Sequence, residues 1–102
     1  MPFDVSFEAP IWAYDGPGGW HFVTLPKRLS HEIHASAATA AKPGGSLPVT
    51  AIIGATRWKT SIFWDRKRDA YLLPVKAAVR TKEQLREGDS PEIALVAGFT
   101  IG

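Results

Sequence analysis

The stretch RWKTSIFWDRKRDAYLLPVKAAVR, residues 57–80, holds the pattern that decides the fold. From Arg57 to Trp64 the side chains alternate between the two faces of an extended chain, which indicates a β-strand. One face carries Trp58, Thr60, Ile62 and Trp64, and the other carries Arg57, Lys59, Ser61 and Phe63. The charged run 65–69 predicts a turn and residues 70–73 predict the returning strand, so a β-hairpin is expected here.

A helix is expected directly after this hairpin. Pro74 suits the first turn of a helix, because its missing N–H needs no partner there. Val75 and Val79 lie one helical turn apart, and they predict a short helix that ends near Thr81. After it, Leu85–Asp89 is typical of a turn with Gly88 in the left-handed region, and Glu92–Phe99 is typical of a final strand.

The N-terminal part of the chain begins with a second predicted hairpin. Residues 5–11 alternate between apolar and polar side chains, which predicts a half-buried strand. Pro10 cannot donate to a strand ladder, so it places this strand at a sheet edge or at a bulge. A glycine-rich loop at residues 14–19 leads to a second strand at residues 20–25.

Each half of the chain therefore consists of a hairpin, a Leu-Pro pair, a helix and a strand. The segments FVTLP (22–26) and AYLLP (70–74) hold the same place in this order. In the first half, the helix is predicted from Pro26 to about Ala41 and the strand at residues 48–53. We predict a mainly β fold with an internal two-fold repeat, in which roughly six or seven strands form a small barrel with a helix at each end.

Length and composition limit the class of protein. With 102 residues, 45% hydrophobic and 22% charged, the chain is expected to be one globular domain over residues 1–102. It contains no cysteine, which excludes disulfides, thiolate nucleophiles and cysteine-ligated metal sites. The N-terminus lacks the pattern of a signal peptide and no apolar run is long enough to span a bilayer, so we expect a cytoplasmic protein.

Four short motifs follow one another in a recognisable order. They are Trp20-x-Phe22-Val23-x-Leu25-Pro26, Thr60-Ser61, Leu73-Pro74-x-Lys76 with Arg80, and Leu85-x-x-Gly88-Asp89. In these motifs the chain resembles the bacterial domain-of-unknown-function family DUF1905, over about residues 3–96. The resemblance implies a double-split β-barrel capped by helices, similar in outline to the AbrB- and MazE-like transcription factors. It implies no catalytic residue, because the family has no established activity.

Basic side chains are concentrated in the opening stretch. Residues 57–80 hold seven basic and two acidic side chains, a charge of +5, and the remaining five basic and eight acidic side chains give −3. On a nucleic-acid-binding hypothesis, Trp58 or Trp64 stacks on bases. Five basic residues then contact phosphates, two on the strand and three in the turn: Arg57, Lys59, Arg66, Lys67 and Arg68. The alternative is a solvated hairpin above an aromatic core, because alternation places the tryptophans opposite Arg57 and Lys59.

A small-anion site is a further hypothesis. Lys76 and Arg80 are one turn apart at the start of the second predicted helix, where free N–H groups also favour an anion. Arg57 and Lys59 on the preceding hairpin are the other candidate ligand-binding residues. The alternative is that Lys76 and Arg80 are two solvated side chains that repel each other slightly.

The sequence favours no metal or catalytic site. His31 and His34 are spaced to chelate a metal ion, but no third ligand follows at a suitable spacing. No serine lies in a nucleophile-elbow context, and no carboxylates form a recognisable acid–base pair. Trp20 and Trp58 are predicted to pack in the core, and Trp12 and Trp64 are left unassigned. The alternative is that Trp12 or Trp20 lies at the rim of a ligand pocket.

We therefore predict a non-catalytic binding module that uses no cofactor and no metal. Its expected partner is a small anionic ligand or a protein, and it does not associate with a membrane. The alternative is a nucleic-acid-binding protein that uses the stretch Arg57–Arg80. An enzyme whose pocket is assembled from residues distant in sequence is a third hypothesis. The sequence does not decide the oligomeric state.

Overall fold

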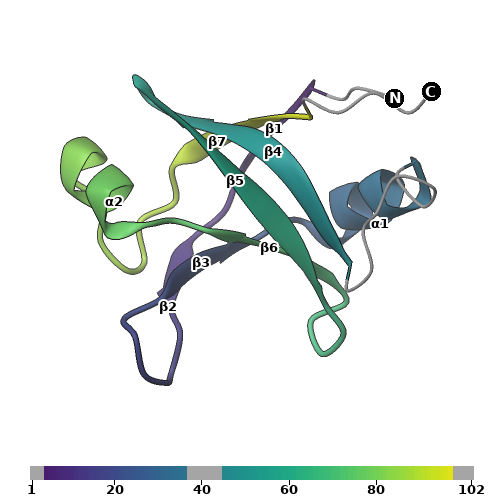
Figure 1. The fold of residues 1–102 in the computed structure, drawn as a ribbon, viewed down its shortest axis with the longest axis horizontal. Coiled ribbons are helices and arrows are strands. Elements are labelled where there is room, and N and C mark those ends of the chain that lie inside the picture. Colours follow the sequence, from purple (N-terminus) through teal and green to yellow (C-terminus); the bar gives the residue numbers. More distant parts are fainter. Residues whose placement is uncertain (1–3, 37–44, 98–102) are drawn as a thin grey trace.

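The structure is a computed structural model that describes residues 4–36 and 45–97. Within these ranges the chain forms seven strands and two helices (Figure 1). In chain order they are β1 (Asp4–Glu8), β2 (Ile11–Ala13), β3 (His21–Thr24), α1 (Lys27–Ser36), β4 (Ser46–Ile53), β5 (Thr56–Asp65), β6 (Ala70–Pro74), α2 (Ala77–Glu83) and β7 (Glu92–Val96). The prediction of a mainly β fold with two short helices is confirmed.

The strands form one antiparallel sheet in the order β1-β7-β4-β5-β6-β3-β2. The strands at the two ends of this order, β1 and β2, are joined in the sequence only by Ala9 and Pro10. One N-terminal segment therefore pairs with β7 and then with β3, and the sheet curls into a small barrel-like shape (Figure 1). The single strand predicted for residues 5–11 is divided at Pro10, which cannot donate to a ladder.

The core lies inside the curled sheet and is mainly aliphatic. Its fully buried side chains include Ile11, Val23, Leu47, Ile62, Leu73, Ile93 and Leu95. Trp58 is 7% exposed and belongs to this core, as predicted. Trp20 is 54% exposed, so its prediction as a core residue is wrong. It immediately precedes β3 and shares a face with Phe22, opposite the buried Val23.

Each helix is tied to the strand that it covers. The helix α1 packs on β6, where the buried Ser30 hydroxyl accepts a hydrogen bond from the Tyr71 N–H at 3.1 Å and donates to the Leu25 carbonyl at 3.4 Å. The helix α2 packs on β5, where the Thr56 hydroxyl donates to the Glu83 carboxylate at 2.6 Å. Figure 1 shows the two helices on opposite sides of the curled sheet.

The internal repeat is present in the structure, and its centre lies between β3 and β6. The helix α1 begins at residue 27 and α2 begins at residue 77, an offset of 50 residues (77 − 27). The β3–β6 ladder has the same offset at its centre, where Val23 pairs with Leu73. Antiparallel pairing of the two equivalent strands is what a two-fold axis requires.

The two Leu-Pro pairs that suggested the repeat are out of register with it. The Leu25 N–H donates to the Tyr71 carbonyl at 3.0 Å, and the Val75 N–H donates to the His21 carbonyl at 2.9 Å. These two bonds are equivalent under the offset of 50, so Leu25 corresponds to Val75 and not to Leu73. The sequence echo, at an offset of 48 (73 − 25), misplaces the repeat by two residues.

Pro74 does not begin the second helix, contrary to the prediction. It is the last residue of β6, where it pairs with Phe22, and α2 begins at Ala77. Because the Val75 N–H points to β3, the nitrogen of Pro74 faces β5. The pairing of β5 with β6 ends at Leu72, so Pro74 removes no hydrogen bond from a ladder.

The turn predicted before β7 is confirmed and helps to close the sheet. Gly88 has a φ of 94°, and its N–H donates to the Ile11 carbonyl at 2.8 Å, while the Asp89 carbonyl accepts from the Ile11 N–H at 2.9 Å.

The predicted continuations of the first helix to Ala41 and of the last strand to Phe99 lie outside the described residues. Neither described helix has the length and apolar character needed to cross a membrane.

Candidate functional site

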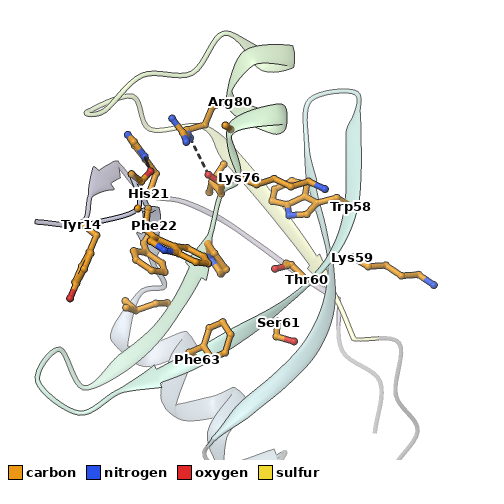
Figure 2. A pocket seen from close by; sticks show the side chains of 17 residues that line it. Tyr14, His21, Phe22, Trp58, Lys59, Thr60, Ser61, Phe63, Lys76 and Arg80 are labelled. Atoms are coloured by element: carbon orange, nitrogen blue, oxygen red, sulfur yellow. Dashed lines mark hydrogen bonds between the residues drawn. The ribbon is translucent and has the colours of Figure 1, made fainter. Parts of the chain in front are cut away.

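A pocket opens because β5 pairs with β4 over a longer stretch than with β6. It pairs with β4 from Thr56 to Phe63 but with β6 only from Phe63 to Asp65. The rest of β5 separates from β6 and from the start of α2, and a pocket of about 1020 Å³ lies there (Figure 2). This volume is at the upper end of the range of ligand sites, about 300–1,000 Å³.

The floor of the pocket is an apolar face of the sheet that points away from the core. Phe63 pairs with Leu72, and Phe22 pairs with Pro74, so these four side chains share one face across β5, β6 and β3. All four line the pocket. Their neighbours along the chain point to the opposite face and are fully buried: Ile62, Leu73 and Val23.

Three basic side chains line the pocket, and no aspartate or glutamate does. Lys59 comes from β5, and Lys76 and Arg80 come from the start of α2. The half-buried Arg80 donates from Nε to the Val75 carbonyl at 3.1 Å, which holds the guanidinium in place and leaves its terminal N–H groups for other partners. Figure 2 shows Lys59 extending outward from β5, away from Phe22, so its ammonium lies at the rim.

Three of the four residues predicted to bind a ligand thus line one pocket. The fourth, Arg57, is exposed on the same face of β5 as Lys59 but is not a lining residue. At the start of α2, the N–H groups of Val79 and Arg80 donate to the Lys76 carbonyl at 3.0 and 3.1 Å, and the Val75 N–H donates to the His21 carbonyl at 2.9 Å. These three backbone groups are therefore occupied, and the side chains of Lys76 and Arg80 bring positive charge to this side of the pocket.

His21 lines the pocket from β3. Its Nδ1 lies 2.9 Å from the Gly19 carbonyl, and because a carbonyl only accepts, the hydrogen is on Nδ1. In the neutral ring, Nε2 is then a hydrogen-bond acceptor.

The position equivalent to His21 in the other half of the repeat, under the offset of 50, is Tyr71, which is 1% exposed near α1. A large ring therefore fills the α1 side of the molecule, and a smaller, half-buried ring lines the pocket on the α2 side.

Aromatic rings gather at the hairpin formed by β2 and β3, with Phe22 at their centre. Trp20 stacks on Phe22 with ring centroids 6.0 Å apart and an interplanar angle of 8°. Tyr14 meets Phe22 edge-on at 6.3 Å, and Trp12 is tilted against it at 5.2 Å. Trp20, Tyr14 and Phe22 all line the pocket.

The sequence pointed to Trp20 only as the alternative to a core position, and it did not point to Tyr14, Phe22 or Phe63 as residues of this pocket. The signal was present in runs that do not alternate, such as Phe22-Val23, Ile62-Phe63 and Leu72-Leu73. An apolar run gives a strand two apolar faces, as in sheets that are covered on both sides. Here one face is the core and the other is the pocket floor.

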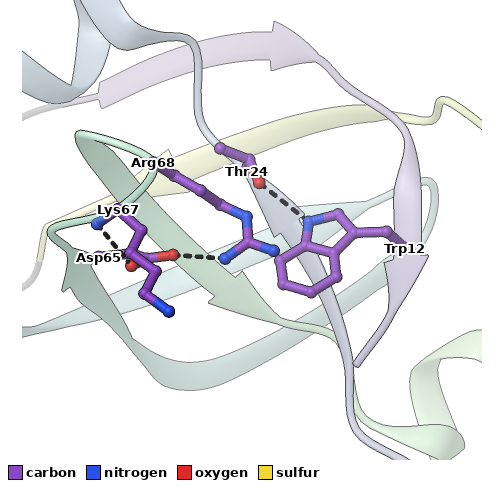
Figure 3. Close-up of polar contacts among 5 residues, drawn as sticks. All are labelled: Trp12, Thr24, Asp65, Lys67 and Arg68. Atoms are coloured by element: carbon purple, nitrogen blue, oxygen red, sulfur yellow. Dashed lines mark hydrogen bonds and ion pairs between the residues drawn. The ribbon is translucent and has the colours of Figure 1, made fainter. Parts of the chain in front are cut away.

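The basic tip of the β5–β6 hairpin is a separate region (Figure 3). Arg68 Nη1 lies 2.6 Å from Asp65 Oδ2, and the Arg68 guanidinium lies 4.2 Å from the centroid of the Trp12 ring. Trp12 in turn donates from Nε1 to the Thr24 hydroxyl at 2.9 Å. Of the three basic turn residues predicted to contact phosphates, Arg68 therefore already has two partners within the chain. Arg66 and Lys67 are exposed.

The environment shifts the pKa values of two groups. The hydrogen bond from Arg68 holds the pKa of Asp65 below its ordinary value of 3.8, partial burial opposes this effect, and the Lys67 N–H, 3.1 Å away, adds to it. Burial raises the pKa of the Tyr71 phenol above 10.0. Neither group lines the pocket.

The two histidines of α1 contact the same hairpin. His31 Nε2 lies 3.0 Å from Asp69 Oδ2, and His34 stacks on Trp64 with ring centroids 4.5 Å apart. Trp64 also meets Tyr71 edge-on at 5.1 Å. Both histidines therefore help to hold α1 against the hairpin, and the structure shows no cluster of metal-ligating side chains within residues 4–36 and 45–97.

One protein-family model matches most of the chain. The family model described as a domain of unknown function, DUF1905, matches residues 7–95. The chain belongs to the DUF1905 family. The matched range includes every residue that lines the pocket, so the pocket lies within the DUF1905 domain. A comparison with curated proteins returned no match.

Proposed function

We propose that this chain is a non-catalytic binding module and that the pocket between β5 and β6 holds a small anionic ligand with an apolar body. One observation carries the proposal: three basic side chains, an aromatic floor and no carboxylate line the same pocket. The apolar floor favours burial of a ligand's hydrocarbon surface, and the basic side chains favour an anionic group. Arg57 remains a predicted additional contact of the ligand, because it is exposed on β5 two residues before Lys59.

A binding role suits the polar groups of the pocket better than catalysis does. Nucleophilic catalysis requires a hydroxyl that is hydrogen-bonded to a base. The lining contains Thr60, Ser61 and His21, but among the described residues no hydrogen bond joins the histidine to either hydroxyl. The His21 nitrogen Nδ1 is instead engaged by the Gly19 carbonyl.

Thermal unfolding with a panel of amphipathic anions tests the proposal. A ligand that binds the folded state at 100 times its Kd adds about 2.7 kcal/mol, which raises Tm by on the order of 10 °C in a domain of this size. The double variant Lys76→Ala with Arg80→Ala is expected to lose this increase. Lys27→Ala with Lys82→Ala removes the same charge from exposed positions outside the pocket and is expected to keep it. Arg57→Ala alone decides whether the fourth predicted residue takes part.

The outcome also separates the other possible partners. If no anion raises Tm, the small-ligand proposal fails, and a protein partner at the exposed aromatic face becomes the better hypothesis. If both double variants lose the increase equally, the effect is one of overall charge and the pocket is not its site. The expected location in the bacterial cytoplasm stays a prediction.

Nucleic acid is the second candidate ligand, supported by the charge of +5 on residues 57–80 and by the exposure of Arg66 and Lys67. Three observations make it the weaker candidate. Arg68 is engaged by Asp65 and Trp12, Trp58 is in the core, and Trp64 is stacked on His34. A basic tip without free aromatic rings lacks the stacking surfaces that single strands require.

A further inference from the structure

The most exposed aromatic side chains of the described residues lie close together. In the described part of the chain, the large apolar side chains with the greatest exposure are Tyr14, Trp20 and Phe63, at 50%, 54% and 45%. Tyr14 and Trp20 flank the loop between β2 and β3, and Phe63 is on β5. All three line the pocket, so their exposure is concentrated on a single concave surface. Exposed apolar groups that gather in this way mark a binding surface.

Trp20 has neighbours within the chain that favour one orientation of its ring. Phe22 stacks on the indole with an interplanar angle of 8°. Gly18 lies so close to the indole that a Cβ at this position would be 2.9 Å from Cδ1 and Nε1. Gly18 also has a φ of 99°, which glycine adopts without strain. An aromatic ring that is already ordered loses little entropy when a ligand stacks on it.

A third strand adds an aromatic ring to the same pocket. Phe63 projects from β5 on the sheet face that also carries Phe22, and Figure 2 shows both rings in the pocket. Aromatic rings prefer offset stacking or edge-to-face contact with another ring, so a flat ligand ring gains directional contacts here. An aliphatic chain gains burial alone. The basic side chains at the N-cap of α2 and within it, Lys76 and Arg80, line the same pocket.

We propose, on the premise of the binding function above, that the ligand is a planar aromatic acid. Its ring system stacks on Trp20 above the floor formed by Phe22 and Phe63. Its carboxylate or phosphate is directed to Lys76 and Arg80. Ligands with a carboxylate and ligands with a phosphate share this chemistry, a flat ring joined to one anionic group.

Three probes of similar size separate the parts of this proposal. They are 2-naphthoate, undecanoate with the same number of carbon atoms, and uncharged 2-naphthylmethanol. Isothermal titration calorimetry with the full chain is expected to show that naphthoate binds at least tenfold more tightly than either other probe. Trp20→Leu is expected to weaken naphthoate binding at least tenfold and to leave undecanoate binding unchanged. Trp20→Phe keeps a ring and is expected to retain most of the affinity.

A second variant tests the role of the indole without replacing Trp20, in case Trp20→Leu alters the fold. Gly18→Ala keeps the indole but removes the space in which it lies, so it is expected to weaken naphthoate binding while the far-ultraviolet circular dichroism stays that of the wild type. If undecanoate binds as tightly as naphthoate, or if Trp20→Leu leaves naphthoate binding unchanged, the aromatic ligand is excluded and the anion-binding function stands. If neither anion binds, or if naphthylmethanol matches naphthoate, the anion-binding function itself is overturned.

Discussion

Ser30 and Arg80 occupy equivalent positions in the two halves of the chain, and each donates a side-chain hydrogen bond to the carbonyl five residues before it. Ser30 Oγ lies 3.4 Å from the Leu25 carbonyl, and Arg80 Nε lies 3.1 Å from the Val75 carbonyl. The short serine is fully buried between α1 and β6, whereas the long arginine is half-buried and lines the pocket. One backbone arrangement therefore serves packing in the first half and a candidate binding site in the second.

The buried serine is expected to be important for stability. Ser30→Ala leaves the Tyr71 N–H without its acceptor in a place that water does not reach, which costs about 1–3 kcal/mol. Chemical denaturation measures the change in the free energy of unfolding. Ser36→Ala, at an exposed position of the same helix, is the control and should change it by less than about 0.5 kcal/mol. Equal effects of the two substitutions would show that the bond to Tyr71 adds no stability.

The contact between Thr56 and Glu83 is expected to hold α2 against β5. Thr56→Val keeps the shape of the side chain but removes the donor to the carboxylate, at an expected cost of about 1–2 kcal/mol. Hydrogen exchange of the α2 amides should accelerate, because α2 is short and has few other anchors. Thr81→Val, on the exposed side of α2, is the matched control. Unchanged exchange in Thr56→Val would contradict the anchoring role.

The hairpin tip should make stability depend on pH in the acid range. Because the pKa of Asp65 is lowered in the folded state, its contribution is fully present above the unfolded value, near 3.8, and is lost as pH falls through the folded value. At neutral pH, Asp65→Asn should destabilise the protein by about 0.2–1 kcal/mol, as expected for a pair near the surface. The difference between the two proteins should shrink as pH falls below 3.8. A difference that is constant from pH 7 to pH 2.5 would exclude a contribution from the charged form.

Binding to oligonucleotides should be weak and sensitive to salt. Arg66 and Lys67 offer two exposed charges at the tip, so a few phosphate contacts are available there, and the tip itself provides no free aromatic ring for base stacking. Fluorescence titration with mixed DNA and RNA oligonucleotides should show binding at low salt that disappears at physiological salt. Saturable binding at physiological salt that Arg66→Ala with Lys67→Ala abolishes, and Lys27→Ala with Lys82→Ala does not, would instead establish nucleic acid as the ligand.

Local patterns in the sequence were sufficient to predict the elements of the fold. Alternation in residues 57–64 predicted a strand with Trp58 inward, and Pro10 predicted an interruption of pairing. The structure confirms both, because the period of two along a strand and the missing N–H of proline act within a few residues. The same local view placed Trp20 in the core, since an aromatic residue beside a strand does not reveal which face will be covered.

Composition, periodicity and turn residues by themselves determined a mainly β barrel-like domain with two helices, and they selected four candidate ligand contacts: Arg57, Lys59, Lys76 and Arg80. Only the tertiary structure decided that Lys59, Lys76 and Arg80, but not Arg57, line one pocket with aromatic side chains. The reason is that the pocket exists where β5 leaves β6, and strand separation depends on pairing between distant segments. The register of the repeat was decided in the same way. A ladder centred on Val23 and Leu73 fixes which residues are equivalent, whatever the local resemblance of the two Leu-Pro pairs.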